Sequence, residues 1–351
     1  TDADEGTAQY VTDTKELKGD FIEDVTLEAG QTYKITGTVN FLDGTTLTIP
    51  AGTTLYGTSG SSYLAINRGA MIMANGTKDE PIIFTSAQDI AGNSAQNDQG
   101  QWGGLTILGK STNNKGERTY EAGTQKYGPV EGVAVEDDNS GTLSYVIIKY
   151  SGFEVETDKE LNGLSLASVG SGTTIENIAV IGSADDGVEF WGGTVNVTNL
   201  YVYNAGDDSI DTDQGYTGVI DNAVVKQVVV DDETDSRALE ADSFDETESG
   251  DPIAIPTLKN HQFTLSSFDD DEIIDISVVI SAIKEFLDSI DEGRNFAVIS
   301  NNDVINITSI SGKVIERTTA KSEHEMFSCT HCGFVTQYQV ELNVHMRIHY
   351  I

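Results

Sequence analysis

Three similar segments between residues 173 and 233 decide the fold. They read "TTIENIAVIGSADDGVEFWGG" from Thr173, "NVTNLYVYNAGDDSIDTDQGY" from Asn196 and "VIDNAVVKQVVVDDE" from Val219. When the segments are aligned, Asn177, Asn199 and Asn222 fall in register, 22 and then 23 residues apart. Each Asn precedes a short β-rich run, and two of the runs then reach an acidic turn, "ADDG" or "GDDS". The stretch therefore reads as an internal repeat.

A period near 22 residues with short strands, Gly and Asn is typical of a parallel β-helix. A single coil cannot bury its inner face, whereas stacked coils bury a continuous apolar column. We expect this column to include Ile178, Val180, Leu200, Val202 and Val224. The recurring Asn suits an inward turn, where its amide can bond backbone groups of neighbouring coils and tolerate a left-handed conformation. "GTLSYVIIKYSG" upstream and "PTLKNHQFTL" downstream fit the same slot, which extends the predicted β-helix over about residues 20–265.

Several segments also carry a resemblance to a known group of proteins. They are "GTTLTIPAGTTLYG", "RGAMIMANGTKDEPIIFTSA", "QWGGLTILGK", "DDGVEFWGGTVNVTNL" and "GDDSIDTDQGYTGVIDNAVV". Over about residues 20–265 the chain resembles bacterial cell-surface or lipid-anchored proteins with a right-handed parallel β-helix. The resemblance implies that fold and an extracellular or cell-surface location, and it allows a lipid anchor upstream of Thr1. It implies no particular activity, because most such proteins have unproven activity and a fold does not fix a function.

The acidic composition limits which classes of molecule can bind the chain. Asp and Glu outnumber Lys and Arg by 57 to 20, which gives a formal net charge of −37. Such a surface repels nucleic acid phosphates, so we expect no nucleic acid to bind the bulk of the chain. No run of eighteen apolar residues is present, so the sequence predicts no transmembrane segment. A chain with two closely spaced Cys residues has no disulfide framework.

The acidic turns form the sharpest cluster of chemistry-bearing residues. Besides Glu189, it contains Asp185, Asp186, Asp207, Asp208, Asp211 and Asp213. One coil of separation places Asp185 below Asp207 and Asp186 below Asp208, about 4.8 Å apart by strand spacing. Stacked carboxylates repel one another, and Ca²⁺, which takes six to eight oxygen ligands, would relieve that repulsion. These six Asp residues are therefore a candidate calcium site, and the alternative is a set of solvated turns that discourage aggregation.

Catalysis on the β-helix is the alternative to a binding role. A glycoside hydrolase needs two carboxylates at a set separation, and Trp191 and Tyr216 could stack on a sugar ring. A lyase needs a base near a metal, and "DSRALEAD" places Arg237 beside Asp235 and Glu240. Against catalysis, His261 is the sole His before residue 324, and the sequence shows no nucleophile elbow and no phosphate loop. We expect a non-catalytic binding or structural protein with a protein or glycan ligand and no assigned catalytic residue. A polysaccharide lyase or glycoside hydrolase is the alternative.

The composition changes near Phe268. "FDDDEIIDISVVISAIKEFLDSIDEG" places apolar residues at helical spacing, with Asp275 as a cap at the start and Gly293 at the end. This predicts an amphipathic helix that docks on the end of the β-helix. A helix that mediates dimerisation is the alternative. "NFAVISNN" and "VINITSISGKVIE" predict further strands. The predicted organisation is thus an N-terminal segment over 1–19, the β-helix over 20–265, a small α+β region over 266–320, and a linker with a terminal module over 321–351.

The terminal module carries a metal-ligand pattern. Cys329-x2-Cys332-x12-His345-x3-His349 matches a tetrahedral zinc site, because a hairpin turn can supply two thiolates and a helix two imidazoles one turn apart. Over residues 327–349 the pattern resembles a Cys-Cys-His-His zinc finger of ββα fold. Phe327 and Leu342 occupy that family's core positions, whereas Thr336 stands where the family usually has Phe, and Phe334 could fill that core. Zinc is the cofactor that this resemblance implies, and calcium is the candidate cofactor that the acidic turns of the β-helix indicate.

The finger is a poor candidate for reading DNA. The four helix positions that reach bases in the family hold Tyr338, Val340, Glu341 and Val344. None of these is a residue of good base readout, and the acidic domain adds repulsion. We therefore expect a structural or protein-contact finger, with a zinc-dependent nucleic-acid binder as the third alternative. The two resemblances imply different locations, the bacterial exterior and the eukaryotic nucleus, so a fusion or designed chain is also consistent with the sequence.

Overall fold

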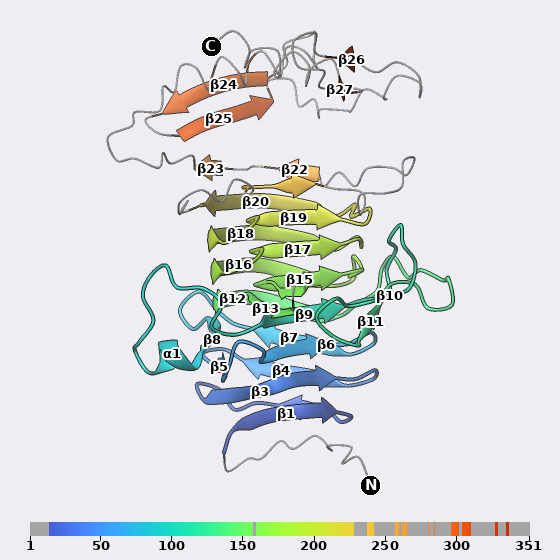
Figure 1. Cartoon of the computed structure of the whole chain (residues 1–351), viewed down its shortest axis with the longest axis vertical. Helices are drawn as coiled ribbons and strands as arrows, with labels where there is room; N and C mark the ends of the chain where they lie inside the picture. The colour runs from blue at the N-terminus through green and yellow to red at the C-terminus, as the bar shows by residue number, and fades with distance from the viewer. Residues whose placement is uncertain are drawn as a thin grey trace. The chain divides into compact units, whose positions relative to one another are not determined.

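The computed structural model divides the chain into two units, Thr1–Phe268 and Asp269–Ile351. It describes residues 14–156, 159–227, 237–241, 257–259, 262–264, 280, 284, 296–301, 304–309, 327–328 and 335–336. In the first unit, short parallel strands stack coil upon coil from β1 (Glu16–Phe21) upward (Figure 1). The first unit is therefore a parallel β-helix, and its first coil begins at Glu16, inside the segment that the sequence assigned to residues 1–19.

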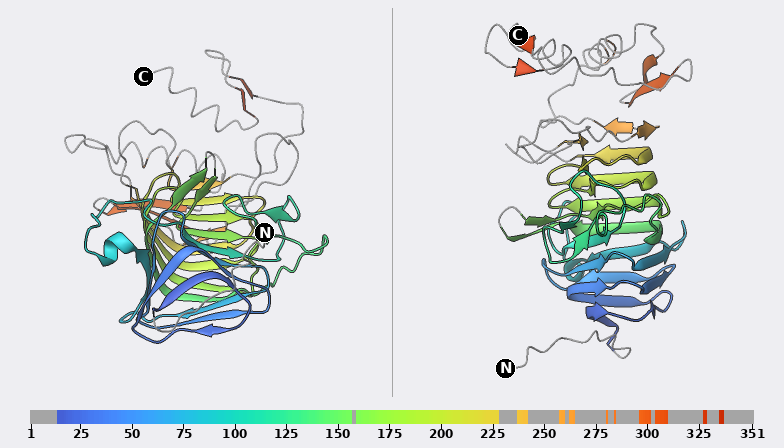
Figure 2. Two further views of the ribbon diagram at one scale, coloured as in Figure 1. Left: turned by 60° about the horizontal axis from the view of Figure 1, so that its bottom comes forward. Right: turned by 90° about the vertical axis from the view of Figure 1, so that its right-hand side faces the viewer.

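The strands of each coil lie on three faces of one 19-stranded sheet in the described part of the chain (Figure 2). Face 1 contains β2 (Val25–Thr26), β4 (Thr46–Pro50), β7 (Met71–Asn75), the first halves of β12 (Gly141–Ser151), β16 (Thr174–Ser183), β18 (Asn196–Ala205) and β20 (Val219–Lys226), and β22 (Thr257–Lys259). Face 2 contains β5 (Thr54–Gly57), β8 (Ile82–Ser86), the second halves of β12, β16, β18 and β20, and β23 (Gln262–Thr264). Face 3 contains β6 (Tyr63–Ile66), β9 (Gly104–Leu108), β15 (Leu164–Ala167), β17 (Val188–Trp191), β19 (Ile210–Asp213) and β21 (Glu240–Ala241). At the N-terminal end, β1 and β3 (Thr32–Phe41) pair across faces 2 and 3.

The repeating Asn forms the corner between faces 1 and 2. Asn177, Asn199 and Asn222 adopt φ of 56°, 57° and 63°, the left-handed conformation that the sequence predicted. Their side chains do not turn inward, however. Asn199 Nδ2 donates to Asn177 Oδ1 at 2.9 Å, and Asn222 Nδ2 donates to Asn199 Oδ1 at 2.6 Å, on the exposed side of the corner. The expectation of an inward turn was wrong, because these amides lie on the exposed side of the corner and bond one another instead of backbone groups.

The core is the inner column of the coils. Ile178, Val180, Leu200 and Val202 are all at most 2% exposed, as predicted. The prediction that Val224 is an inner residue was wrong. Leu200 pairs with Ala223, so Val224 pairs with the exposed Tyr201 and is half-buried. The residues on that coil that enter the core are Ala223 at 1% and Val225 at 2% exposed.

Other described segments project from the coils or belong to the second unit. Those of the first unit are α1 (Ala87–Ile90) and two hairpins, β10 (Arg118–Thr119) with β11 (Lys126–Tyr127) and β13 (Phe153–Glu156) with β14 (Lys159–Leu161). The second unit contains two antiparallel pairs, β24 (Phe296–Asn301) with β25 (Val304–Ser309) and β26 (Phe327–Ser328) with β27 (Val335–Thr336). Of the predicted helix after Phe268, only Ile280 and Lys284 lie within the described residues, and both are helical. No described helix is long and apolar enough to cross a membrane.

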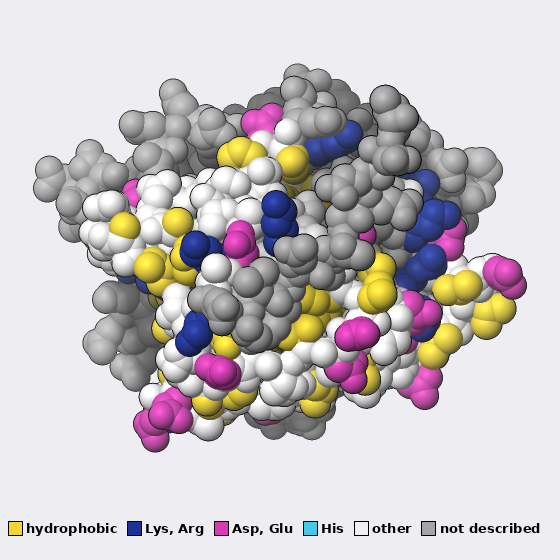
Figure 3. Space-filling view, turned by 90° about the horizontal axis from the view of Figure 1, so that it is seen from below, with side chains coloured by type: hydrophobic (Ala, Val, Ile, Leu, Met, Phe, Trp, Pro, Cys, Tyr) yellow, Lys and Arg dark blue, Asp and Glu magenta, His cyan; other side chains and the backbone are white. Residues whose placement is uncertain are grey.

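Charged side chains are spread over the N-terminal end of the β-helix. Seen from that end, Asp and Glu side chains are scattered among Lys, Arg and apolar groups (Figure 3). The concentrated acidic feature lies elsewhere, on the coils formed by β15, β17, β19 and β21.

Candidate functional site

Face 3 presents a column of polar side chains on its outer side. Val188 and Phe190 are fully buried, so the alternation of a strand directs Glu189 and Trp191 outward. The parallel register stacks one outward residue from each coil: Thr106, Ser165, Glu189, Asp211 and Glu240. The column thus changes from hydroxyl to carboxylate groups along the β-helix.

A second ladder runs along the turns that enter face 3. The backbone N–H of Asp186 donates to Asn162 Oδ1 at 3.1 Å, and that of Asp208 donates to Asp186 Oδ1 at 2.9 Å. The backbone N–H of Arg237 donates in the same way to Asp208 Oδ1. Asn162, Asp186 and Asp208 are 1%, 8% and 1% exposed. Each side chain therefore satisfies a backbone donor of the next coil, a structural role for two of the acidic residues.

The two ladders combine into one residue pair per coil, three positions apart. The pairs are Asn162 with Ser165, Asp186 with Glu189, Asp208 with Asp211, and Arg237 with Glu240. We call the two all-acidic pairs, Asp186, Glu189, Asp208 and Asp211, the carboxylate box. Asn162 bounds the box at one end, where its Nδ2 donates to Glu189 Oε2 at 2.5 Å. Arg237 bounds the other end.

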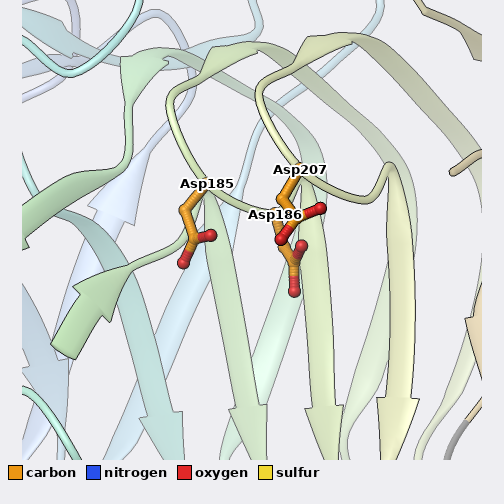
Figure 4. Close-up of side chains that lie close together, drawn as sticks. All are labelled: Asp185, Asp186 and Asp207. Carbon is orange, nitrogen blue, oxygen red and sulfur yellow. The ribbon is translucent and has the colours of Figure 1, made fainter. Parts of the chain in front are cut away.

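Three of the four carboxylates of the box have oxygens close enough to share a cation. One oxygen each from Asp186, Glu189 and Asp211 lie within 4.8 Å of one another. A second group, Asp185, Asp186 and Asp207, meets the same limit at the turns (Figure 4). Asp211 Oδ1 is buried and has no hydrogen-bond partner among the described residues. Carboxylate oxygens are the ligands that hard cations such as Ca²⁺ take, so the donor set fits such an ion.

The carboxyl groups strongly perturb one another. Burial, followed by the charges of Glu240 and Asp213, raises the pKa of Asp211 to about 7. Burial, a hydrogen bond with Glu240 and nearby acidic charges raise the pKa of Asp208 to about 9. Desolvation and the surrounding carboxylates raise the pKa of Asp186 and of Glu189 well above their usual values. At neutral pH the box therefore retains protons unless a cation compensates the charge.

Outside the box, Asp185 and Glu121 extend the same acidic field. Burial and then the charge of Glu160 raise the pKa of Asp185 to about 8. Loss of water around its carboxylate, followed by the charges of Glu160 and Asp211, raises the pKa of Glu121 to about 7. Glu121 lies in the connection between β10 and β11, and Glu160 lies in β14. Both hairpins thus bring acidic groups toward the same site.

An aromatic pocket of about 510 Å³ lies beside the box. Trp191 lies in it between two tyrosines, with ring centroids 5.5 Å from Tyr120 and 6.4 Å from Tyr127. The Tyr120 hydroxyl lies 3.3 Å from Thr106 Oγ1 and 3.2 Å from Ser165 Oγ, which fastens the hairpin onto face 3. The remaining lining residues are polar: Glu117, Arg118, Thr119, Glu121 and Gln214. A mostly polar pocket of this size with an aromatic floor suits a small polar ligand or part of a longer one.

Comparison with known protein families places the fold. The family model described as a pectate-lyase-like β-helix domain matches residues 19–273. The chain belongs to the pectate-lyase-like β-helix domain family. No curated protein and no solved structure gave a significant match.

Within this pectate-lyase-like β-helix, the predicted acidic residues do not all share one set of mutually close carboxylate oxygens. Asp185, Asp186 and Asp207 lie together at the turns, and Asp186 also meets Asp211. Asp208 lies instead against Arg237 and Glu240. Asp213 pairs in register with Trp191, in the neighbouring outward column.

Two aromatic predictions have different outcomes. Trp191 lines the pocket with 7% of its surface exposed, and it remains a candidate for contact with a sugar ring. Tyr216 cannot stack on a ligand. It is fully buried, its ring lies 4.3 Å from that of Phe190, and its hydroxyl donates to the backbone oxygen of Val195. The prediction for Tyr216 was wrong because its position follows a turn that directs the ring into the core.

Several predicted residues lie outside the described part of the chain. They are Asp235, His261, Cys329, Cys332, Phe334, Tyr338, Val340, Glu341, Leu342, Val344, His345 and His349. Phe327 is described only as the first residue of β26, which pairs with β27. The zinc site accordingly stays a prediction from the sequence.

Other residues of the site were not predicted. Asn162 and Ser165 in "NGLS" repeat the spacing of "DGVE" and "DSID" on the next coils, so a search for a polar pair three positions apart could have found them. Tyr120 and Tyr127 come from a hairpin inserted between coils, far outside the repeat. No local pattern marks them, because their role depends on contacts with residues more than forty positions away, such as Ser165 and Gln214.

Proposed function

We propose that this β-helix is a non-catalytic, extracellular or cell-surface protein that binds a polysaccharide segment beside a calcium-loaded carboxylate box. The observation that carries the proposal is the contiguity of an aromatic pocket and a cluster of carboxylates on one face of the β-helix. Glu121 links the two, since it lines the pocket and the charge of Asp211 acts on it. Aromatic rings contact the apolar faces of sugars, and carboxylates and Arg118 can bond the hydroxyls.

Calcium has a defined place in this proposal. Asp186, Glu189 and Asp211 would hold the ion, with Asp185 and Asp207 on the solvent side. Bound there, Ca²⁺ would supply a charge that lets the carboxylates ionise and a coordination position that a ligand hydroxyl or carboxylate can take. The family membership supports the β-helix as the carrier of such a site but leaves the choice between binding and catalysis open.

One observation favours a second candidate, a polysaccharide-acting enzyme. Carboxyl groups with raised pKa values stand next to one another in the box, and a glycoside hydrolase needs a protonated carboxyl beside an ionised one. Asp186 or Glu189 would be the acid because burial raises its pKa well above the usual value, and Asp211, whose pKa is about 7, would be the ionised partner. Binding without turnover remains the primary proposal, since Glu189 is held by Asn162 and Asp186 by the backbone of Asp208.

The test measures binding and turnover in one set of variants. Soluble neutral and acidic polysaccharides are immobilised, and retention of the protein is measured with calcium and with a chelator. We expect Trp191→Ala and Arg118→Ala to weaken retention about tenfold, in line with the loss of roughly 1.4 kcal/mol of contact energy. Tyr201→Ala is the control for loss of an aromatic residue elsewhere, since Tyr201 lies on face 2 and is 37% exposed, and thermal melting of Trp191→Ala checks that loss of the buried Trp191 leaves the fold intact.

Turnover separates the two candidates. Release of new reducing ends or of unsaturated products from a retained polysaccharide, lost in Asp211→Asn, would replace the binding proposal by the enzymatic one. Equal retention of wild type, Trp191→Ala and Arg118→Ala on every polysaccharide would contradict both. The C-terminal module is proposed to be a separate structural zinc site with no part in this binding.

A further inference from the structure

Arg237 lies where the two ladders of the site end. Its backbone N–H donates to Asp208 Oδ1, and its backbone oxygen accepts from Ser209 N at 2.9 Å. Its guanidinium nitrogen NH1 lies 3.0 Å from Glu240 Oε1 and 3.6 Å from Asp208 Oδ2. The backbone of Arg237 thus continues the turn ladder, while its side chain places a positive charge between carboxylates of two consecutive coils.

The guanidinium of Arg237 lies among carboxylates, as a bound metal cation would. The Asp208 side chain is 2% exposed, the Glu240 side chain 31% and the Arg237 side chain 46%. Asp211 is the register partner of Glu240, so a third carboxylate lies on the neighbouring strand. The guanidinium therefore lies against two carboxylates and is partly exposed.

The four pairs of the site differ in how their charge is balanced. Asn162 and Ser165 are neutral. The two pairs of the carboxylate box carry four acidic groups, and in the last pair the charge of Arg237 compensates that of Glu240. The guanidinium of Arg237 also lies against Asp208. This carboxylate of the box is therefore not available to a free ion.

We propose that Arg237 is a built-in counter-ion that occupies a divalent-cation position between Asp208 and Glu240, and so lowers by one the number of cations that the carboxylate box binds. The proposal rests on the proposed cation binding of the same box and concerns its stoichiometry. A guanidinium carries one charge and coordinates through fixed N–H donors, whereas a divalent ion would use the same oxygens as ligands. Arg237 is thus a specificity-determining residue that confines added cations to Asp186, Glu189 and Asp211 and to the turn residues beside them.

The test is a calorimetric titration of the full chain with Ca²⁺, repeated with Tb³⁺ luminescence as a second readout. Arg237→Gln removes the charge but leaves the backbone bonds of residue 237 to Asp208 and Ser209. We expect this variant to bind one cation more than the wild type. Arg237→Lys keeps a charge at the same position and should bind the wild-type number.

A further variant locates the added ion. Combining Arg237→Gln with Glu240→Gln should return the stoichiometry to that of the wild type, because the gained position loses a ligand. Circular dichroism and thermal melting of each variant establish that the β-helix is intact. An Arg237→Gln variant that does not fold would shift the test to Arg237→Met, which also removes the charge, keeps the aliphatic stem and should likewise bind one cation more than the wild type.

The outcomes separate this inference from the proposed function. Equal stoichiometry in wild type and Arg237→Gln, with calcium bound by both, overturns the role of Arg237 and leaves the proposed calcium binding intact. Calcium bound by Arg237→Gln and not by the wild type overturns the proposed calcium binding and supports the role of Arg237. Absence of binding in both proteins overturns both, and a gain of one ion in Arg237→Gln but not in Arg237→Lys supports the inference.

Discussion

At the scale of single residues, the left-handed corner explains why Asn recurs. Asn tolerates positive φ better than most residues, and its amide can bond the same residue on the next coil. Tyr145 lies between Ser144 and Val146, which pair with the neighbours of Asn177, and it adopts φ of 51°. The left-handed corner therefore continues to one more coil, but the residue there is Tyr and not Asn.

We expect Tyr145→Asn to stabilise the β-helix. A large residue at positive φ costs about 1 kcal/mol, and an Asn there could also bond Asn177. The expected gain is a rise of about 2–4 °C in the melting temperature. Tyr56→Asn is the matched control, because Tyr56 is a half-buried residue of β5 and is not among the residues with positive φ. A drop in melting temperature for Tyr145→Asn similar to that of the control would show that the ring contributes more than the strain costs.

At the scale of elements, the corner residue and not the hydrophobic content sets the register. Counting from each Asn, the first and third following residues enter the core, which gives Ile178 and Val180 on one coil and Ala223 and Val225 on another. If inner residues are chosen by the size of their side chains, Val224 is selected in place of Ala223. The predicted register of that strand is then shifted by one residue. Because side chains alternate with period two, such a shift moves each residue to the opposite side of the sheet.

A pair of neighbouring truncations measures this register. Val225→Ala should destabilise the protein by about 2 kcal/mol, because it opens a cavity in the inner column. Val224→Ala should change the free energy of unfolding by less than about 0.5 kcal/mol, since Val224 lies on the outer side. Chemical denaturation of both variants provides the comparison. The reverse order of the two losses would contradict the register described above.

The predictable part of the fold is the part that repeats. The recurring Asn and the acidic turns predicted the coils around β16, β18 and β20, and "PTLKNHQFTL" predicted β22 and β23. The hairpin β10–β11 could not be predicted in this way, because its two-residue strands have no period and its position depends on Tyr120 meeting Thr106 and Ser165. The same holds for the site: the carboxylates were found by their spacing, whereas the aromatic floor requires the folded structure.

At the scale of the whole molecule, the raised pKa values predict how stability depends on pH. Asp211, Asp185 and Asp208 have pKa values of about 7, 8 and 9 in the folded protein, whereas an unfolded Asp has a pKa near 3.9. Between about pH 4 and pH 9 the folded state therefore binds more protons than the unfolded state, and stability falls as the pH rises. In chelator we expect the melting temperature to fall by several degrees from pH 5 to pH 8.5.

Calcium should remove most of this pH dependence. At pH 8.5, millimolar Ca²⁺ should raise the melting temperature by binding the folded state, whereas sodium at matched ionic strength tests general screening. Asp186→Asn should raise the melting temperature in chelator and reduce the calcium response. An Asn can still accept from Asp208 N, as Asn162 does from Asp186 N. Asp79→Asn, in an exposed turn, is the control for loss of one charge. Equal effects of calcium and sodium would leave the box as an acidic edge without a specific site.

The predicted zinc site lies in the second unit, which makes its metal separable from that of the β-helix. We expect one zinc per chain by elemental analysis, and none after Cys329→Ser or His345→Ala, because each change removes one of four ligands. A zinc-selective chelator should make residues 321–351 sensitive to limited proteolysis, since a structural zinc supplies much of the folding free energy of such a module. The melting transition of the β-helix should not change under this treatment, whereas a calcium-selective chelator should lower it at pH 8.5 and leave zinc content unchanged. A chain purified without zinc, whose C-terminal module nevertheless resists proteolysis, would show that the spacing of Cys329, Cys332, His345 and His349 does not reflect a zinc site.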